Sequence, residues 1–437
     1  MPEPYDVITM GRIGVDLYPL EVGVPLARVE TFGKFLGGSP TNVAVAAARL
    51  GRRTAVITRT GQDAFGTYLH QELERFGVDA RWATAVAEYP TPVTFCEIFP
   101  PDDFPLYFYR QPKAPDLEIH ASDLDLDAVR AARIFWMTGT GLSAEPSRSA
   151  TLAALAARGT GPADASGATT ATVFDLDWRP MFWDGGDDST EAPARYREAL
   201  AHATVAVGNV DECAIATGER EPYAAARALL AAGVELAVVK QGPKGVLAVH
   251  RDGTSADCPP LPVEVVNGLG AGDAFGGALC HGLLAGWPLD RLVRYANAAG
   301  AIVASRLACS SAMPFPDEVE RAVEAGAVTA EPGARAAQAD LSTPVGPGAA
   351  PDLGAQAARE APQDPGTPPD PSAQPDPGAP ADPSAPATRQ APPDPGAPAT
   401  RQAPPDPGAP ATRQAPPDPG ASAAPNTPAA PRTGADS

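Results

Sequence analysis

The sequence predicts an α/β protein: a doubly wound, mostly parallel sheet with a small antiparallel β-lid and a disordered C-terminal tail. Three observations support this prediction. Up to about residue 330, short apolar strands alternate with amphipathic helices, which is typical of parallel βα units. Residues 92–100 and 106–110 are instead alternating or aromatic and resemble an antiparallel pair. After Phe315 the chain has no aromatic residue at all.

Composition divides the chain into two parts, 1–330 and 331–437. Apolar residues run through the first part, which is long enough for one sizeable core. The second part is rich in Pro, Ala, Gly and Asp, and a twelve-residue unit begins at Ala387, Ala399 and Ala411. Because such a segment has nothing to bury, it cannot offset the entropy lost on ordering. We therefore expect 331–437 to be disordered.

The N-terminal elements begin with a buried strand at residues 5–11. We expect the lid to come from about 12–20, 31–36 and 92–110. A helix is predicted within 37–51, where Ser39 is a suitable N-cap and Pro40 suits the first helical position. A strand over 54–60 and a helix over 63–76 follow.

Strands and helices then alternate more regularly. Apolar runs predict strands, and apolar residues at helical spacing predict helices. The predicted strands are 133–138, 172–175, 204–208, 236–240 and 246–250, and the predicted helices are 145–158, 190–202, one opening at 209–212, one within 267–284 and 289–306. Residues 159–170 are expected to be a flexible surface insert.

One glycine-rich stretch, 267–280, should open a helix near Asp273. Glycines at a helix N-terminus leave backbone N–H groups free at the positive end of the dipole, which favours phosphate. A carboxylate beside phosphate makes sense as a general base that takes a proton from an attacking hydroxyl. The alternative is a plain helix cap.

Several polar or glycine residues directly follow predicted strands. In a parallel sheet the carboxyl ends of the strands meet at one edge, where ligands bind. We therefore expect them to line one cleft. They are Asp175, Asn209, Gly242 and Gly270.

Composition also excludes several classes of function. A net charge of −20, of which −14 belongs to residues 1–330, argues against nucleic acid or an anionic membrane as partner. Five scattered cysteines without a CxxC indicate neither disulfides nor structural zinc. We found no signal peptide and no apolar run of transmembrane length, so we expect a cytoplasmic protein.

Four motifs in order resemble the ribokinase-like (PfkB) carbohydrate kinases, over about 310 residues. They are GGSPTNVA from Gly37, NVDE from Asn209, KQGPKG from Lys240 and NGLGAGDAFGGAL from Asn267. Other segments, such as GRIGVDLYPL and FDLDWRPMFW, are most similar to the family's sugar-acid kinases that act on 5-dehydro-2-deoxy-D-gluconate in myo-inositol catabolism. This resemblance implies transfer of the γ-phosphate of ATP to the C6 hydroxyl of that acid.

The resemblance also implies roles for individual residues. Asp273 would be the general base, and the backbone amides of Gly270, Ala271 and Gly272 the anion hole. Arg110 and Arg179 would bind the substrate carboxylate or the transferring phosphate. The residues that would hold sugar hydroxyls are Asp16, Gly37, Gly38 and Asn42.

On the nucleotide side, Asn209 and Glu212 would organise Mg²⁺ through water. Lys240, Gly242 and Gly245 would lie along the nucleotide, with Asn297 near the adenine. A monovalent cation such as K⁺ would sit near the anion hole in many relatives.

Alternatives remain at this stage. Asn209 and Glu212 also fit a simple helix cap, and Arg110 also fits a solvated edge charge. Two positions depart from the family pattern, Gly268 where many members have Thr and Asp177 where many sugar-acid relatives have Asn.

Other substrates and another class of function also remain. A 2-keto-3-deoxygluconate kinase or another ribokinase-like sugar kinase is the enzymatic alternative, and a non-catalytic sugar-binding or scaffold protein the other. Apolar lid residues Phe95, Ile98 and Phe108 lead us to expect a homodimer through the lid.

Overall fold

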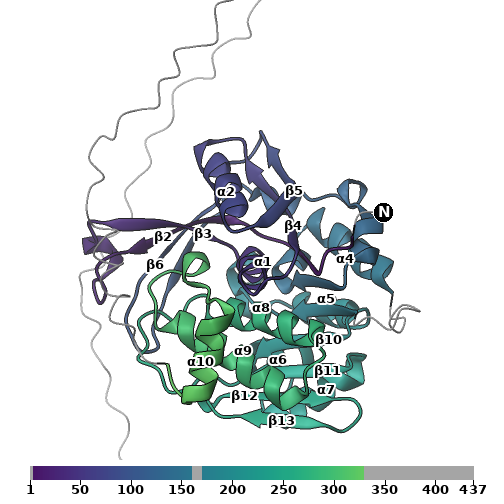
Figure 1. The fold of residues 1–437 in the computed structure, drawn as a ribbon. Coiled ribbons are helices and arrows are strands. Elements are labelled where there is room, and N and C mark those ends of the chain that lie inside the picture. The colour runs from purple at the N-terminus through teal and green to yellow at the C-terminus, as the bar shows by residue number, and fades with distance from the viewer. Residues whose placement is uncertain (1–2, 160–169, 329–437) are drawn as a thin grey trace, which may run out of the picture. The chain divides into compact units, whose positions relative to one another are not determined.

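The computed structural model describes residues 3–159 and 170–328. The predictions for the insert at 159–170 and the tail at 331–437 fall almost wholly outside this range. Within it, two sheets and their helices form the fold (Figure 1).

The larger sheet has nine described strands in the order β13-β12-β11-β10-β9-β8-β1-β4-β5. Pairing is parallel from β11 through to β5, and antiparallel for β11–β12 and β12–β13. The predicted doubly wound, mostly parallel sheet is therefore confirmed, with an antiparallel hairpin added at one edge. The bounds are β1 Val7–Met10, β4 Thr54–Gly61, β5 Val78–Val86, β8 Ile134–Thr138, β9 Ala171–Asp175, β10 Val205–Asn209, β11 Leu236–Lys240, β12 Val246–His250 and β13 Ser255–Cys258.

The smaller sheet confirms the lid prediction. Its order is β3-β2-β6-β7, antiparallel at β2–β3 and β6–β7 and parallel at the central β2–β6 contact. Figure 1 shows β2, β3 and β6 extending to one side of the main body. The bounds are β2 Gly14–Pro19, β3 Phe32–Gly37, β6 Val93–Cys96 and β7 Leu106–Tyr109.

Helices cover both faces of the main sheet, because alternate side chains of each buried strand point to opposite faces. Val7 belongs to one apolar core and its neighbour Ile8 to the other. Helices α1 (Ser39–Arg49), α2 (Ala64–Arg75), α8 (Ala271–Leu284), α9 (Leu289–Ala304) and α10 (Pro316–Ala325) contribute to the first core. Helices α3 (Leu126–Ala131), α4 (Ser147–Arg158), α5 (Ala192–Leu200), α6 (Val210–Thr217) and α7 (Pro222–Ala232) contribute to the second.

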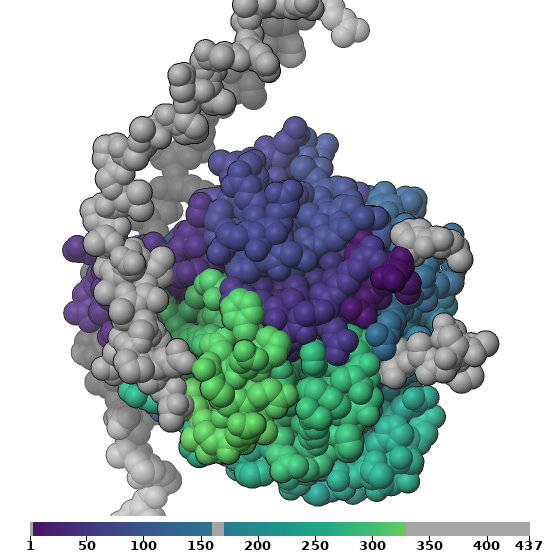
Figure 2. All heavy atoms as spheres, viewed as in Figure 1, coloured from purple at the N-terminus to yellow at the C-terminus, as the bar shows by residue number. Residues whose placement is uncertain are grey.

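The end of α1 lies against the start of α10. Arg49, at the end of α1, donates a 2.7 Å hydrogen bond to the carbonyl of Met313 and lies over the ring of Phe315. In the space-filling view the green C-terminal helices accordingly adjoin the purple-blue N-terminal residues (Figure 2).

Helices α1 and α8 pack against each other without intervening side chains. A Cβ added at Gly277 would lie 2.4 Å from the Cβ of Ala46, and one at Gly276 would lie 2.6 Å from the Trp136 ring. Both glycines are therefore required for this close approach. The contact brings the N-termini of the two helices together.

Some elements were not predicted: β5, β13, α3, α7 and α10. In the described part of the chain, no helix is long and apolar enough to cross a membrane.

Candidate active site

Asp273 lies in the first turn of α8, and its carboxylate is held by side chains of α1. Ser39 Oγ donates to Oδ1 at 2.8 Å, and Asn42 Nδ2 donates to Oδ2 at 2.8 Å. Asp273 is thus not a helix cap. The prediction that Ser39 is the N-cap of α1 is wrong: Gly38 occupies that position, and the Ser39 hydroxyl is turned toward α8 instead.

Burial raises the pKa of Asp273, while the hydrogen bonds from Asn42 and Ser39 and the charge of Arg12 oppose the rise. A carboxylate with a raised pKa is a better proton acceptor for a hydroxyl. This combination of burial and fixed donors suits a general base.

The turn before Asp273 has the properties of an anion site. Gly270 is the N-cap of α8 with φ of 81° and provides no side-chain cap. Its conformation favours glycine, and an added Cβ would lie 2.6 Å from Cys309 Sγ. Asn267 fixes the turn, because its Nδ2 donates to the Leu307 carbonyl at 2.7 Å and its Oδ1 accepts from Leu269 N at 3.0 Å.

Lys240, at the end of β11, brings a positive charge to the same turn. Its Nζ would lie 3.3 Å from a Cβ at Gly272. Although burial alone would lower the pKa of Lys240, nearby carboxylates, Asp175 first, raise it above its ordinary value. The ammonium and the helix N-terminus therefore favour negative charge at one place.

Asp16 on β2 faces the glycines that lead into α1. A Cβ at Gly37 would lie 2.2 Å from the Asp16 carboxyl group, and a Cβ at Gly38, where φ is 103°, would lie 2.4 Å from the Arg12 carbonyl. Tyr18 donates its hydroxyl to Asp16 Oδ2 at 3.1 Å and contacts Cys309 Sγ at 2.8 Å. Burial raises the pKa of Asp16 to about 7.

Asp177 is surrounded by positive charge. Arg12 Nη2 donates to both of its carboxylate oxygens at 3.1 and 3.0 Å, and Arg179 Nη2 lies 2.9 Å from Oδ1. Thr140 Oγ1 lies 3.4 Å from Oδ2. Burial would raise the pKa of Asp177, but the two arginines outweigh it and lower the pKa. With φ of 35°, Asp177 is the one non-glycine residue with positive φ in the described chain.

Asn209 and Glu212 form a reciprocal capping box at the start of α6. Asn209 N donates to Glu212 Oε2 at 2.7 Å, and Glu212 N donates to Asn209 Oδ1 at 2.9 Å. The helix cap that was considered as an alternative is therefore present. It uses Glu212 Oε2, whereas Oε1 lies outside the cap, 3.8 Å from Arg179 Nη1. One remaining carboxylate oxygen fits a Mg²⁺ ion that keeps most of its water shell.

The described residues hold no group of three or more His, Cys, Asp or Glu side chains arranged to bind a metal. A magnesium ion would therefore depend on phosphate oxygens and water as well as on Glu212.

Gly242, Gly245 and Asn297 lie in a second group. Gly242 (φ 57°) and Gly245 (φ 97°) delimit the turn between β11 and β12. A Cβ at Gly245 would lie 2.0 Å from the Cys258 carbonyl, and Asn297 Nδ2 donates to the Pro259 carbonyl at 2.9 Å. Gly245 and Asn297 thus converge on the Cys258–Pro259 segment rather than on Asp273, whereas a Cβ at Gly242 would have no neighbour within 4 Å.

The surroundings of Arg110 differ from the solvated strand edge that the sequence suggested as an alternative. Its side chain is buried, forms two bonds from Nη2 to the Asp116 carboxylate at 3.0 and 2.7 Å, and lies 4.8 Å from the Phe182 ring centre. It is therefore not a solvated edge charge. Its guanidinium is already engaged by a carboxylate six residues along the chain.

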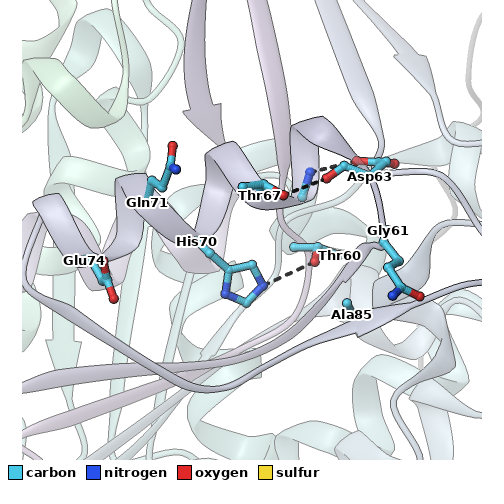
Figure 3. Close-up of a pocket in the computed structure, with 10 residues that line it drawn as sticks. Thr60, Gly61, Asp63, Thr67, His70, Gln71, Glu74 and Ala85 are labelled. Atoms are coloured by element: carbon cyan, nitrogen blue, oxygen red, sulfur yellow. Dashed lines mark hydrogen bonds between the residues drawn. The ribbon is translucent and has the colours of Figure 1, made fainter. Parts of the chain in front are cut away.

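A surface hollow of about 470 Å³ lies elsewhere, between the end of β4, α2 and β5 (Figure 3). Two carboxylates line it, Asp63 and Glu74. Asp63 accepts from Gly66 N and from Thr91 N and Oγ1, and is thus committed to capping α2. His70 lies 3.4 Å from Thr60 Oγ1, and burial lowers its pKa. None of the predicted site residues lines this hollow.

Sequence reasoning missed three side chains at the site: Arg12, Tyr18 and the bonding role of Ser39. Their partners are 165, 291 and 234 residues away. For Arg12 a signal existed, since a lone arginine stands between the apolar residues Met10 and Ile13.

Comparison with known proteins agrees with this geometry. A family model described as "pfkB family carbohydrate kinase" matches residues 5–316. A curated relative from Clostridium tetani, named 5-dehydro-2-deoxygluconokinase, is 31% identical over 328 residues, which covers 74% of this chain and 94% of the relative. Other relatives carry the same name at similar identity.

Solved structures share the fold. A putative ribokinase II from E. coli in complex with ATP and Mg²⁺ is 24% identical, with a TM-score of 0.65 over 74% of this chain and 99% of that chain. An aminoimidazole riboside kinase from Salmonella enterica, complexed with aminoimidazole riboside and an ATP analogue, is 26% identical, with a TM-score of 0.58 over 72% and 99%.

Proposed function

Because the chain belongs to the pfkB family of carbohydrate kinases, we propose that it transfers the γ-phosphate of ATP to the C6 hydroxyl of 5-dehydro-2-deoxy-D-gluconate. The names of its curated relatives support this substrate. The product would be the 6-phosphate, and the reaction would belong to myo-inositol catabolism.

The observation that carries the proposal is the position of Asp273. Its carboxylate is buried, fixed by Ser39 and Asn42, and placed in the first turn of α8 beside Lys240. In the proposed reaction the substrate hydroxyl gives its proton to Asp273 as its oxygen bonds to the γ-phosphorus. The bond from that phosphorus to the β–γ bridging oxygen breaks, and ADP leaves with the electron pair.

The surrounding groups would stabilise the negative charge on the transferring phosphoryl group. The amides of Gly270, Ala271 and Gly272 and the Lys240 ammonium suit the oxygens of the transferring phosphoryl group. Glu212 would hold Mg²⁺ through water, and the ion would supply positive charge against the phosphates. Asp16 and the backbone of Gly37 and Gly38 would accept or position sugar hydroxyls.

ATP and Mg²⁺ are supported as reactants by the family and by the ligands named for the E. coli protein. Gly242, together with Gly245 and Asn297 at Cys258–Pro259, would lie along the nucleotide. Replacing K⁺ with Na⁺ in the assay tests the monovalent-cation expectation.

The test is ADP formation by the full chain against a panel of sugars. We expect the highest kcat/KM with 5-dehydro-2-deoxy-D-gluconate, compared with 2-keto-3-deoxygluconate, ribose and fructose. A higher kcat/KM with 2-keto-3-deoxygluconate would identify that acid as the substrate and would leave the proposed phosphoryl transfer unchanged.

Replacing the base tests the chemistry itself. Asp273→Asn removes the proton acceptor while Ser39 and Asn42 remain, so kcat is expected to fall about 10²- to 10⁴-fold with KM within a few-fold. An unchanged kcat would refute the role of Asp273.

We still propose a homodimer through the lid, but the exposed side chains that support it differ from those expected from the sequence. Ile98 is fully buried inside the lid, so the prediction that it is exposed is wrong. The exposed apolar side chains are Tyr107 and Tyr109 on the edge strand β7, and Tyr109 packs on Phe95 with ring centres 5.4 Å apart. Light scattering of the wild type and of Tyr109→Asp tests this interface.

A further inference from the structure

We propose that Arg12 binds the carboxylate of the sugar-acid substrate, and that Asp177 is the residue that positions it. This inference deepens the proposed function and rests on it. Arg12 therefore distinguishes acids from neutral sugars, a task for which the family resemblance suggested Arg110 and Arg179 but not Arg12.

Arg12 occupies a distinctive place in the chain. It lies in the three-residue connection between β1 of the main sheet and β2 of the lid. Its carbonyl accepts a hydrogen bond from Thr41 Oγ1 at 3.1 Å and lies against Gly38. The guanidinium lies 6.0 Å from the ring centre of Phe108 on β7. Arg12 is thus fixed where lid, main sheet and α1 meet.

The guanidinium has unused binding capacity. Both hydrogen bonds to Asp177 come from the same nitrogen, Nη2. Nε is buried and has no hydrogen-bond partner in the described part of the chain. A guanidinium can bind carboxylates through several of its nitrogens, so this contact through Nη2 alone leaves the Nε of Arg12 for a second carboxylate. A buried donor left without a partner is costly, and a ligand oxygen would satisfy it.

A second arginine beside Arg12 also has unused binding capacity. Arg12 and Arg179 share one carboxylate, Asp177, and the Nε of Arg179 is likewise buried and without a hydrogen-bond partner in the described part of the chain. Glu212, 3.8 Å from Arg179, supplies a second negative charge, so these two pairs are balanced. A substrate carboxylate would therefore be held through the unused donors of the two guanidinium groups.

Arg12 lies on the sugar side of the base. Its charge lowers the pKa of both Asp16 and Asp273, opposing their burial, so it lies within electrostatic reach of both. Its hydrogen bonds nevertheless go to Asp177. An acid substrate bound between these groups can place one end at Asp273 and its carboxylate at Arg12.

Asp177 positions Arg12 through its unusual backbone. A positive φ is uncommon outside glycine, and Asp and Asn tolerate it best. Here it aims the carboxylate at Arg12, Arg179 and Thr140 together. Asparagine would keep the backbone conformation but lose the charge, so Asp177→Asn should loosen Arg12 without removing it.

The experiment compares an acid with its C1 amide, using whichever sugar acid the wild type turns over best. For Arg12→Gln we expect kcat/KM for the acid to fall about 10- to 100-fold, mainly through KM, and that for the amide to change less than threefold. Arg12→Lys keeps the positive charge of the buried pair but loses the planar guanidinium and its several donors. Its kcat/KM for the acid is expected to lie between the values for Arg12→Gln and the wild type. If Arg12→Gln does not fold, Arg12→Lys tests the proposal in its place.

Asp177→Asn is expected to raise KM for the acid several-fold with kcat nearly unchanged. Arg133→Lys is the matched control, because Arg133 also has a buried unbonded Nε and an ion pair, 3.1 Å to Asp6, at the opposite end of the strands. We expect it to leave both substrates unaffected.

Three results would overturn the proposal. An equal loss for acid and amide would assign Arg12 to the phosphoryl group, and no loss for either would make it structural. A wild type that does not prefer any acid over its amide would also refute it. A preference for an acid other than 5-dehydro-2-deoxy-D-gluconate would refute only the proposed substrate, since the comparison still tests Arg12.

Discussion

Replacing Asp16 with Asn is expected to make the free protein more stable at neutral pH. The pKa of this buried carboxyl is raised from 3.8 to about 7. An acid with a raised pKa in the folded state stabilises the fold below its unfolded pKa, and this stabilisation is lost as pH rises through the folded value. The loss should therefore develop between about pH 4 and pH 7.

The size of the effect follows from the shift. About three pH units at about 1.4 kcal/mol each correspond to about 4 kcal/mol, to be read as an order of magnitude. The Asn variant cannot ionise and can still accept the Tyr18 hydroxyl. The difference in free energy of unfolding between Asp16→Asn and wild type should thus grow by about 4 kcal/mol from pH 4 to pH 8.

The assay is urea unfolding without substrate, in steps of pH, with equal m-values as a requirement. Asp63→Asn is the matched control with the opposite sign. Hydrogen bonds from Thr91 and Gly66 outweigh partial burial and lower the pKa of Asp63, so its stabilisation is present above about pH 4 and lost as pH falls. A pH-independent difference for Asp16→Asn would refute the reasoning.

Three further predictions concern the site and the tail. Tyr18→Phe removes a donor that lowers the pKa of Asp16, so the pH at which KM for the sugar reaches its plateau should rise; an identical KM–pH profile would contradict this. Gly270→Ala should cost about 1–3 kcal/mol and lower kcat, because φ is 81° and the new Cβ would overlap Cys309. Adding Cys309→Gly removes both Cys309 side-chain atoms, at 2.6 and 2.8 Å from the new Cβ, and should recover part of the stability; no recovery would mean that φ sets most of the cost. Removing residues 331–437 should leave kcat and KM unchanged, which a comparison of truncated and full chains checks.

Local patterns in the sequence predicted the parts of the site that depend on near neighbours. The Asn209–Glu212 spacing allowed a helix cap as the alternative to a magnesium role, and that cap is present. The Gly-rich stretch predicted the start of a helix near Asp273, and α8 begins at Ala271. The alternation of strands and helices predicted the parallel sheet. Edge elements were missed, among them β5 and β13, because half-exposed edge strands lack the continuous apolar runs of the buried ones.

Contacts between distant residues could not be predicted in the same way. Ser39 has the residue type and position of an N-cap, but tertiary packing supplies Asp273 as a better partner for its hydroxyl. The pairing of Arg110 with Asp116, only six residues on, was not predicted from the sequence; the role of Arg110 at the substrate stays a prediction. No local pattern pairs Arg12 with Asp177, because only the order of the strands brings them together.

The glycine contact between α1 and α8 has a consequence for how this enzyme can evolve. Ser39 and Asn42 lie on one helix and Asp273 on the other, so the spacing of the two helices sets both hydrogen bonds to the base at once. Gly277 meets Ala46 with no room for a methyl group, so a larger residue at Gly277 would push the two helices apart. Substitutions in the lid and its connection can therefore vary without changing this contact, whereas a larger residue at the α1–α8 contact would change both hydrogen bonds to Asp273 together.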